Sequence, residues 1–131
     1  VTNVIVPADV TDGGPEGVLR DEPPQIDLLR TGVTLASVIE KETGIAAERA
    51  LVASVFHNRL RRGMRLQADP TVIYGLDISG APWDRERLHQ YLDQPSPYNS
   101  YTQWGLPPGP ICNPGASALR AAHAWLSRSP R

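Results

Sequence analysis

The sequence around Gly44 constrains the fold most strongly, because two helical patterns meet there with almost no chain between them. Before it, apolar residues recur at the spacing of one helical face, at Leu28, Leu35, Val38 and Ile39. They predict a first helix from after Pro24 to about Thr43, although Gly32 inside it argues against one continuous helix. Residues 46–62 predict a second helix with an apolar face of Leu51, Val52, Val55 and Phe56. The two helices must therefore meet at a sharp angle.

Two shorter helical patterns follow Gly63. Asp69 before Pro70 predicts a helix cap followed by a short helix that ends at Gly75. Residues 77–83 predict a turn-rich surface segment, and residues 84–92 predict a short polar helix. The main anchors of that helix are expected to be Trp83, Leu88 and Leu92.

A long segment without helical pattern precedes the last helix. Residues 95–115 hold too many prolines and glycines for a helix, and a loop of this length in a small domain is usually functional. Asn113 and Pro114 then predict the start of a helix that runs to about Leu126. Its inward residues are expected to be Leu119, Ala122 and Trp125 or Leu126. Residues 1–25 predict a loop-rich tail in which Val4 to Val6 could form a short strand.

Composition and charge exclude several classes of function. The 131 residues suit a single domain, and a net charge of −1 gives no electrostatic reason to bind nucleic acid or an anionic membrane surface. The one cysteine, Cys112, cannot form an internal disulfide. The histidines show no metal-ligand spacing with it, so no structural zinc site is expected. No run of 18 apolar residues and no signal peptide is present, so this segment is not expected to contact a membrane.

Glu42 is the residue that the first helical pattern leaves to explain. It lies three residues beyond Ile39 and therefore continues the apolar face. Its neighbour Glu40 falls on the opposite, solvated side with Lys41. A carboxyl on an apolar face is unfavourable unless it is paired, protonated or used, and partial desolvation would raise its pKa toward the range of a general acid near neutrality. The alternative is a helix-terminal glutamate that turns into solvent.

Two further places offer side chains that suit a carbohydrate. Gln67 lies in a short irregular link, where its amide can point into a cleft. Tyr98, Asn99 and Tyr101 form a cluster in the long loop. Aromatic rings stack on the apolar faces of sugars, and an asparagine amide offers both a donor and an acceptor to hydroxyl or acetamido groups. Each of these residues also fits an ordinary solvated loop.

The second predicted helix carries residues for which plain structural roles are expected. Glu48 in its first turn favours the helix dipole, and Arg49 is solvated or paired. His57 is more often a surface or satisfied core histidine than a catalytic one. Asn58 and Arg59 are expected to cap or brace the neighbouring loop.

Two stretches of the chain together resemble a known family. The resemblance is carried by LASVIEKETGIAAERALVASVFHNRLRRGMRLQADPTVIYGL and, further on, by SPYNSYTQWGLPPGPICNPGASALRAA. These are similar to the catalytic core of the YceG-like (MltG) endolytic murein transglycosylases, over about residues 34–122. The order of a Glu-Thr pair, a Leu-Gln pair and a Tyr-Asn pair is also that of lysozyme-like lytic transglycosylases. The resemblance implies a predominantly helical α+β fold with a lysozyme-like catalytic core.

The resemblance also implies a reaction and its residues. Glu42 would be the catalytic acid and base, and the substrate-binding residues would be Thr43, Gln67, Tyr98, Asn99 and Tyr101. The enzyme would cleave the β-1,4 bond between N-acetylmuramic acid and N-acetylglucosamine and close a 1,6-anhydro ring. One carboxylate suffices because the muramoyl 6-hydroxyl is the nucleophile, and no metal or cofactor is needed. An ordinary glycosidase needs a second carboxylate, and Asp69, the only nearby acid, is already explained as a helix cap.

Domain organisation, partners and location follow from the same resemblance. Residues 26–131 would form the YceG-like catalytic domain, truncated at its C-terminus, behind the tail of residues 1–25. Family members act in the bacterial cell envelope, where a membrane-spanning helix and a LysM-like domain precede the core and anchor it to the cytoplasmic membrane. The expected partners are peptidoglycan glycan strands and peptidoglycan synthases. The alternative class is a non-catalytic peptidoglycan-binding or scaffold remnant of the family.

Overall fold

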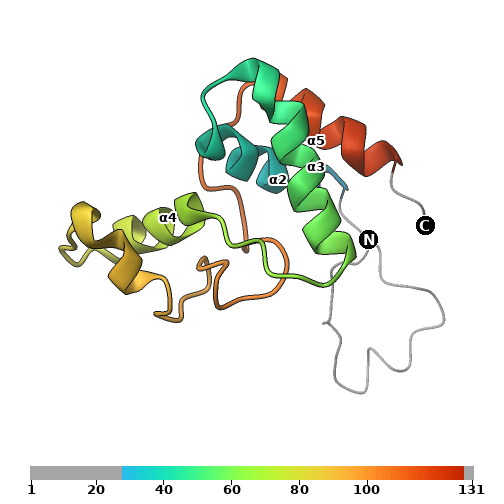
Figure 1. The fold of residues 1–131 in the computed structure, drawn as a ribbon. Helices are drawn as coiled ribbons and strands as arrows, with labels where there is room; N and C mark the ends of the chain where they lie inside the picture. Colours follow the sequence, from blue (N-terminus) through green and yellow to red (C-terminus); the bar gives the residue numbers. More distant parts are fainter. Residues whose placement is uncertain (1–27, 129–131) are drawn as a thin grey trace.

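The computed structural model describes residues 28–128, where every regular element is a helix (Figure 1). The elements, with η for a 3-10 helix, are α2 (Leu28–Glu42), η1 (Ala46–Glu48), α3 (Arg49–Arg61), α4 (Asp69–Ser79), η2 (Arg85–Tyr91) and α5 (Ala116–Arg128). The predicted predominance of helix is therefore confirmed. Residues 28–128 contain no strand, while the tail and the strand expected within it lie outside the described residues, so the α+β assignment stays a prediction.

Three helices form the core and the rest of the described chain forms a lobe beside them. α2, α3 and α5 pack against one another, and α2 also packs against α4. α4 and η2 extend away from the three-helix core, and residues 92–115 lead back from η2 to α5 (Figure 1). The junction between core and lobe therefore lies where α2 meets α4.

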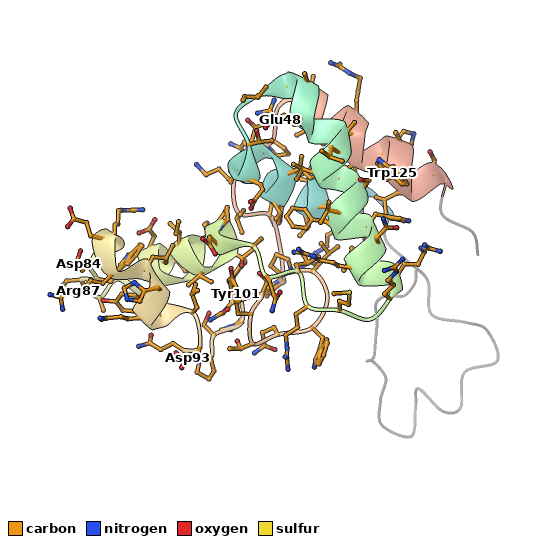
Figure 2. The ribbon with its side chains drawn as sticks, in the orientation of Figure 1. Glu48, Asp84, Arg87, Asp93, Tyr101 and Trp125 are labelled. Atoms are coloured by element: carbon orange, nitrogen blue, oxygen red, sulfur yellow. The ribbon has the colours of Figure 1, made fainter. Side chains whose placement is uncertain are left out.

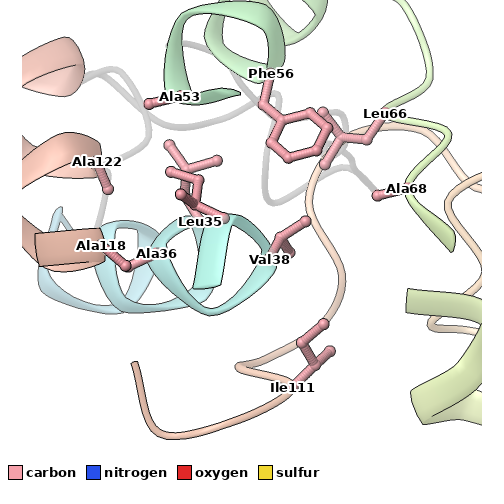
Figure 3. Packing of buried hydrophobic residues seen from close by; sticks show 11 residues of the cluster. Leu35, Ala36, Val38, Ala53, Phe56, Leu66, Ala68, Ile111, Ala118 and Ala122 are labelled. Carbon is pink, nitrogen blue, oxygen red and sulfur yellow. The ribbon is translucent and has the colours of Figure 1, made fainter. Parts of the chain in front are cut away.

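The core combines large apolar side chains with alanines on all three core helices (Figure 3). Leu35 and Val38 of α2 are fully buried, and Phe56 of α3 is almost so. The facing positions of α3 and α5 are alanines with no exposed surface, Ala53, Ala118 and Ala122. Alanine at these positions lets the backbones of the three helices approach closely.

The inward faces of α3 and α5 differ in part from the prediction. Leu51 and Val55 of α3 are 68% and 39% exposed, and Leu119 of α5 is 38% exposed. The buried residues of α3 are Ala53, Phe56 and His57, of which only Phe56 belongs to the predicted face. The predictions were wrong at Leu51, Val55 and Leu119, because the closest helix contacts use alanine. They are confirmed at the other predicted inward residues, which are buried or pack against the core: Val52, Phe56, Ala122, Trp125 and Leu126.

Several element boundaries also differ from the prediction. α2 continues through Gly32, and the second helix begins as the 3-10 turn η1 before α3. α4 continues through Gly75 to Ser79, so residues 77–79 belong to a helix and not to a turn-rich segment. A Cβ at Gly75 would lie 3.1 Å from Ser96 Oγ, so this glycine permits close contact with the long loop and does not end the helix. The helix ends at Gly80, where φ is 81°.

Arg49, the first residue of α3, connects the three core helices through one side chain. Its Nη2 lies 2.9 Å from Glu40 Oε2 of α2, and its Nη1 donates to Ser117 Oγ of α5 at 2.6 Å. It also donates to the Thr43 carbonyl from Nε and Nη2. The other Glu40 oxygen accepts from the Gly115 amide at 2.9 Å, just before α5. Pairing of Arg49 is confirmed, and the prediction of a solvated Glu40 was wrong, since 26% of its side chain is exposed.

Replacing Arg49 by alanine is expected to reduce the free energy of unfolding by about 2–4 kcal/mol, because it leaves the half-buried Glu40 carboxylate without its cation. Denaturant unfolding of the purified chain measures this. The control is Arg85→Ala, which removes an exposed partner of Asp77 and should cost less than about 1 kcal/mol. Equal losses in the two variants would show that the Arg49 contacts add nothing beyond a surface ion pair.

Candidate active site

Glu42 is the last residue of α2, at the junction of core and lobe. The apolar residues before it on the same face are fully buried, whereas Glu42 itself is exposed at the end of the helix. Neighbouring groups still shield its carboxyl. Burial is the main cause that raises the pKa of Glu42, the Asp69 carboxylate raises it further, and Arg59 opposes the rise. The expected direction of the pKa shift is therefore confirmed.

Asp69 does not cap α4, in contrast to the prediction. Ala68 occupies the N-cap position, and no side chain makes a capping hydrogen bond there. Asp69 Oδ1 instead accepts a hydrogen bond of 2.5 Å from the Tyr101 hydroxyl. Figure 2 shows Tyr101 in the long loop, close to the end of α4 that adjoins the core. Burial, followed by this hydrogen bond and the Asp69 charge, raises the pKa of Tyr101 to about 12, so the hydroxyl remains a donor at neutral pH.

Arg59 of α3 supplies the positive charge of the site. Its Nη1 donates to the Leu66 carbonyl, and the backbone carbonyl of Arg59 accepts from the Met64 amide at 2.8 Å. The predicted bracing of the loop by Arg59 is therefore confirmed. Its charge also lowers the pKa values of Glu42 and Tyr101. Two carboxyls, a hydroxyl and a guanidinium from four different segments thus gather at the junction. Sequence reasoning missed Arg59 as part of this group, because it considered only the local loop.

Gln67 has a backbone conformation that is unusual for its residue type. Its φ of 55° is the only positive value at a non-glycine residue among residues 28–128. Its side chain is exposed, while its backbone N–H donates to the Ser100 carbonyl at 3.2 Å. Ser100 Oγ accepts from the Ala68 amide at 2.9 Å and lies 2.7 Å from Thr71 Oγ1. The buried Ser100 thus holds Gln67 through its carbonyl and Ala68 through its hydroxyl, and a strained residue persists only where its surroundings fix it in this way.

Tyr98 and Asn99 face inward. Only 1% of Asn99 is exposed, its Nδ2 donates to the Leu92 and Gln94 carbonyls, and its Oδ1 accepts from the Tyr101 amide at 2.8 Å. Tyr98 packs against the core, and its ring meets the Tyr74 ring edge-on with the two ring centroids 4.9 Å apart. Asn99 therefore holds the loop together, because both Nδ2 hydrogens and the Oδ1 of this buried side chain are bonded to the backbone of the loop.

Thr43 shapes the sharp turn expected around Gly44. Its hydroxyl donates to Glu48 Oε1 at 2.9 Å and accepts from the Ile45 amide at 3.1 Å. The side chain therefore joins the end of α2 to the start of α3. These contacts engage both the donor and one acceptor position of the hydroxyl.

The buried histidine of α3, His57, lies apart from this cluster. His57 is 7% exposed, and its ring lies 5.7 Å from that of Trp125, which Figure 2 shows on α5, away from Tyr101. Burial is the main cause that lowers the pKa of His57, which fits a core histidine. No group of three potential metal ligands occurs in the part of the chain that the structure describes. Nor does any helix of residues 28–128 have the length and apolar character needed to cross a membrane.

Comparison with known proteins decides the family, since residues 20–127 match the YceG-like family. The chain belongs to the YceG-like family. It is 49% identical over 90 residues to the endolytic murein transglycosylase of Bacillus subtilis strain 168, a match that covers 69% of this chain and 24% of that protein. It is 38% identical over 95 residues to the endolytic murein transglycosylase of Streptococcus pneumoniae strain D39, covering 69% and 16%.

A solved structure supports the same assignment. The crystal structure of a YceG-like protein from Listeria monocytogenes is similar with a TM-score of 0.60 and 45% identity, over 72% of this chain and 29% of that one. The family predicted from the sequence is therefore confirmed. This YceG-like chain spans no more than about a quarter of the length of the curated relatives that it matches.

In this YceG-like chain, Asn99→Ala is expected to lower the free energy of unfolding by about 2–4 kcal/mol, because it removes three hydrogen bonds and leaves two carbonyls without a donor. Thermal unfolding measures the loss. Asn113→Ala makes the same substitution at an exposed position of the same loop and is the control. Similar melting temperatures for the two variants would contradict the supporting role of Asn99.

At position 67, glycine should be more stable than alanine, because only glycine adopts a positive φ without strain. We expect Gln67→Gly to be more stable than Gln67→Ala by about 1 kcal/mol. At Gln103, an exposed loop residue whose φ is not positive, alanine should be at least as stable as glycine. Denaturant unfolding of the four variants gives the difference in stability between glycine and alanine at each position. If the same residue were the more stable one at both positions, this would count against strain at Gln67.

Proposed function

We propose that this chain is the catalytic segment of an endolytic murein transglycosylase. Its substrate would be the glycan strand of peptidoglycan, and its product would be a strand with a 1,6-anhydro-N-acetylmuramic acid end. The observation that carries the proposal is Glu42, a partly shielded carboxyl with a raised pKa at an open junction between core and lobe. The relatives named endolytic murein transglycosylase align with the segment that contains it.

The reaction needs one group that first gives and then takes a proton. Protonated Glu42 donates to the glycosidic oxygen, and the β-1,4 bond to the anomeric carbon of N-acetylmuramic acid breaks. The resulting carboxylate accepts the proton of the 6-hydroxyl on the same sugar, whose oxygen attacks the anomeric carbon and closes the anhydro ring. A raised pKa suits both steps, because a general acid–base is most effective when its pKa lies near the working pH.

Asp69 raises the question of hydrolysis, since it is not a helix cap and lies close enough to influence Glu42. A hydrolase would use a second carboxylate as a nucleophile or to activate water. One oxygen of Asp69 is already engaged by the Tyr101 hydroxyl. The family assignment favours transfer to the internal hydroxyl, so we assign Asp69 a supporting role.

The predicted substrate-binding residues divide into two groups. Gln67, whose side chain is exposed, and Tyr101, whose hydroxyl lies in the charged cluster, are proposed to contact the glycan. Thr43, Tyr98 and Asn99 are proposed to support them through the contacts described above. We further propose a lysozyme-like α+β architecture for the whole domain, action in the cell envelope, and peptidoglycan synthases as partners.

Glu42→Gln is expected to reduce formation of anhydro products by about 10²–10⁴-fold, the usual contribution of general acid–base catalysis. Its melting temperature at neutral pH should equal or slightly exceed that of the unmodified chain. A raised carboxyl pKa means that the ionised form is disfavoured in the fold, so this difference should vanish as the pH falls below 4.5.

Glu40→Gln is the matched control for that variant. It weakens the contact with Arg49 and should lower the melting temperature, while the folded molecules retain most of their activity. Mass spectrometry of digested murein measures the products. Equal activity in the two variants would overturn the assignment of Glu42, hydrated reducing ends would indicate a hydrolase, and binding without products would indicate the non-catalytic alternative.

A further inference from the structure

We propose that Asp69, oriented by the Tyr101 hydroxyl, is a positioning residue that keeps the proton on the Glu42 carboxyl at the start of the reaction. The inference deepens the proposed function and rests on it for the role of Glu42. It gives a role to Asp69, which the reaction with a single catalytic carboxylate does not itself require.

The ends of two packed helices bring the acids to the same place. Glu42 is the last residue of α2, Asp69 is the first residue of α4, and these helices are in contact. A carboxylate at the C-terminal end of a helix is already disfavoured by the helix dipole, whereas one in the first turn is favoured. The helix dipole of α2 therefore adds to the features that disfavour a negative charge on Glu42.

The Tyr101 hydroxyl fixes the orientation of Asp69. An acid in the first turn would ordinarily accept from nearby backbone amides, but no capping bond is present in α4 and the hydroxyl takes that place at 2.5 Å. The loop that carries the tyrosine is itself locked, because the Tyr101 amide donates to buried Asn99 Oδ1 and the adjacent Ser100 bonds to Thr71. Asp69 is thereby held by the lobe and the loop together.

The charges around Glu42 act in opposite directions. From α4, Asp69 raises the pKa of Glu42, after the larger effect of burial, and from α3 Arg59 lowers it. Tyr101 faces the same carboxyls from the loop as a neutral donor. α5, which also packs on α2, brings Arg120 and His123, and neither is among the groups that shift Glu42.

Lys41 and Glu40 adjoin Glu42 on its own helix. Glu40 is neutralised by Arg49, and neither residue is among the groups that shift Glu42. Asp69 is therefore the one described acid whose removal should release the Glu42 proton more easily.

The test is a titration of the Glu42 carboxyl by NMR of the full chain with ¹³C-labelled glutamate, the signal being identified by its loss in Glu42→Gln. Asp69→Asn is expected to lower the Glu42 pKa by about 0.5–1 unit, because a nearby negative charge is removed. Asp77→Asn, which makes the same change near the other end of α4, is the control and should leave the Glu42 pKa in place. An unchanged Glu42 pKa in Asp69→Asn, or an equal shift in Asp77→Asn, would overturn the proposal.

Tyr101→Phe provides a second variant, should Asp69→Asn fail to fold. It leaves Asp69 free to turn away, so the Glu42 pKa should fall by a smaller amount, and no change would again overturn the proposal. In activity assays the upper pH limit of anhydro-product formation should move to lower pH in both variants, which a purely structural role would not cause. If the unmodified chain forms no anhydro products while the titration shifts as expected, the proposed function fails and the coupling of Asp69 to Glu42 stands.

Discussion

The contact between Arg49 and Glu40 is the interaction on which the rest of the structure depends. It fixes the end of α2 against the starts of α3 and α5, so the turn at Gly44 has one geometry. Successive residues of a helix are rotated by about 100°, so Glu40 and Glu42 point in nearly opposite directions. Because Glu40 is pinned toward α3 and α5, Glu42 is turned toward α4. One acid of the Glu-Lys-Glu sequence therefore holds the core helices together, and the other faces the junction with the lobe.

The long loop can carry part of the site because buried polar groups replace the hydrogen bonds of a regular element. The Asn99 side chain donates to the Leu92 carbonyl and accepts from the Tyr101 amide. The Ser100 hydroxyl bonds to the Thr71 hydroxyl and to the backbone of the link before α4. Further along, the Ile111 amide donates to buried Ser37 Oγ of α2 at 3.0 Å. A buried backbone group needs such a partner. These contacts tie the loop to both the core and the lobe and give the Tyr101 hydroxyl a fixed place.

How much could be predicted from the sequence depended on how local the decisive contact is. The helices and the candidate Glu42 follow from apolar periodicity and the resemblance, which use neighbours in the chain. Glu40 and Asp69 were misjudged because their partners Gly115 and Tyr101 lie 75 and 32 residues away. Leu51, Val55 and Leu119 were misjudged as inward residues for a different reason, since alanine marks a close helix contact that hydrophobicity does not reveal. Asn99 was taken for a binding residue because an amide in a loop has the same local sequence whether it faces solvent or its own backbone.

The division between core and lobe gives the site a mechanical property as well as a chemical one. Glu42 belongs to the core and Asp69 to the lobe, so the separation of the two carboxyls depends on how the lobe is seated. Arg59, through the Leu66 carbonyl, and Ser100, through the Ala68 amide, hold the intervening link in place. The unfavourable features lie in and beside that link: the positive φ is at Gln67 within it, and the carboxyl with a raised pKa is Glu42 at the end of α2. They persist only because the surrounding contacts outweigh them, so the rigidity of the link and the proton affinity of Glu42 are two consequences of the same packing.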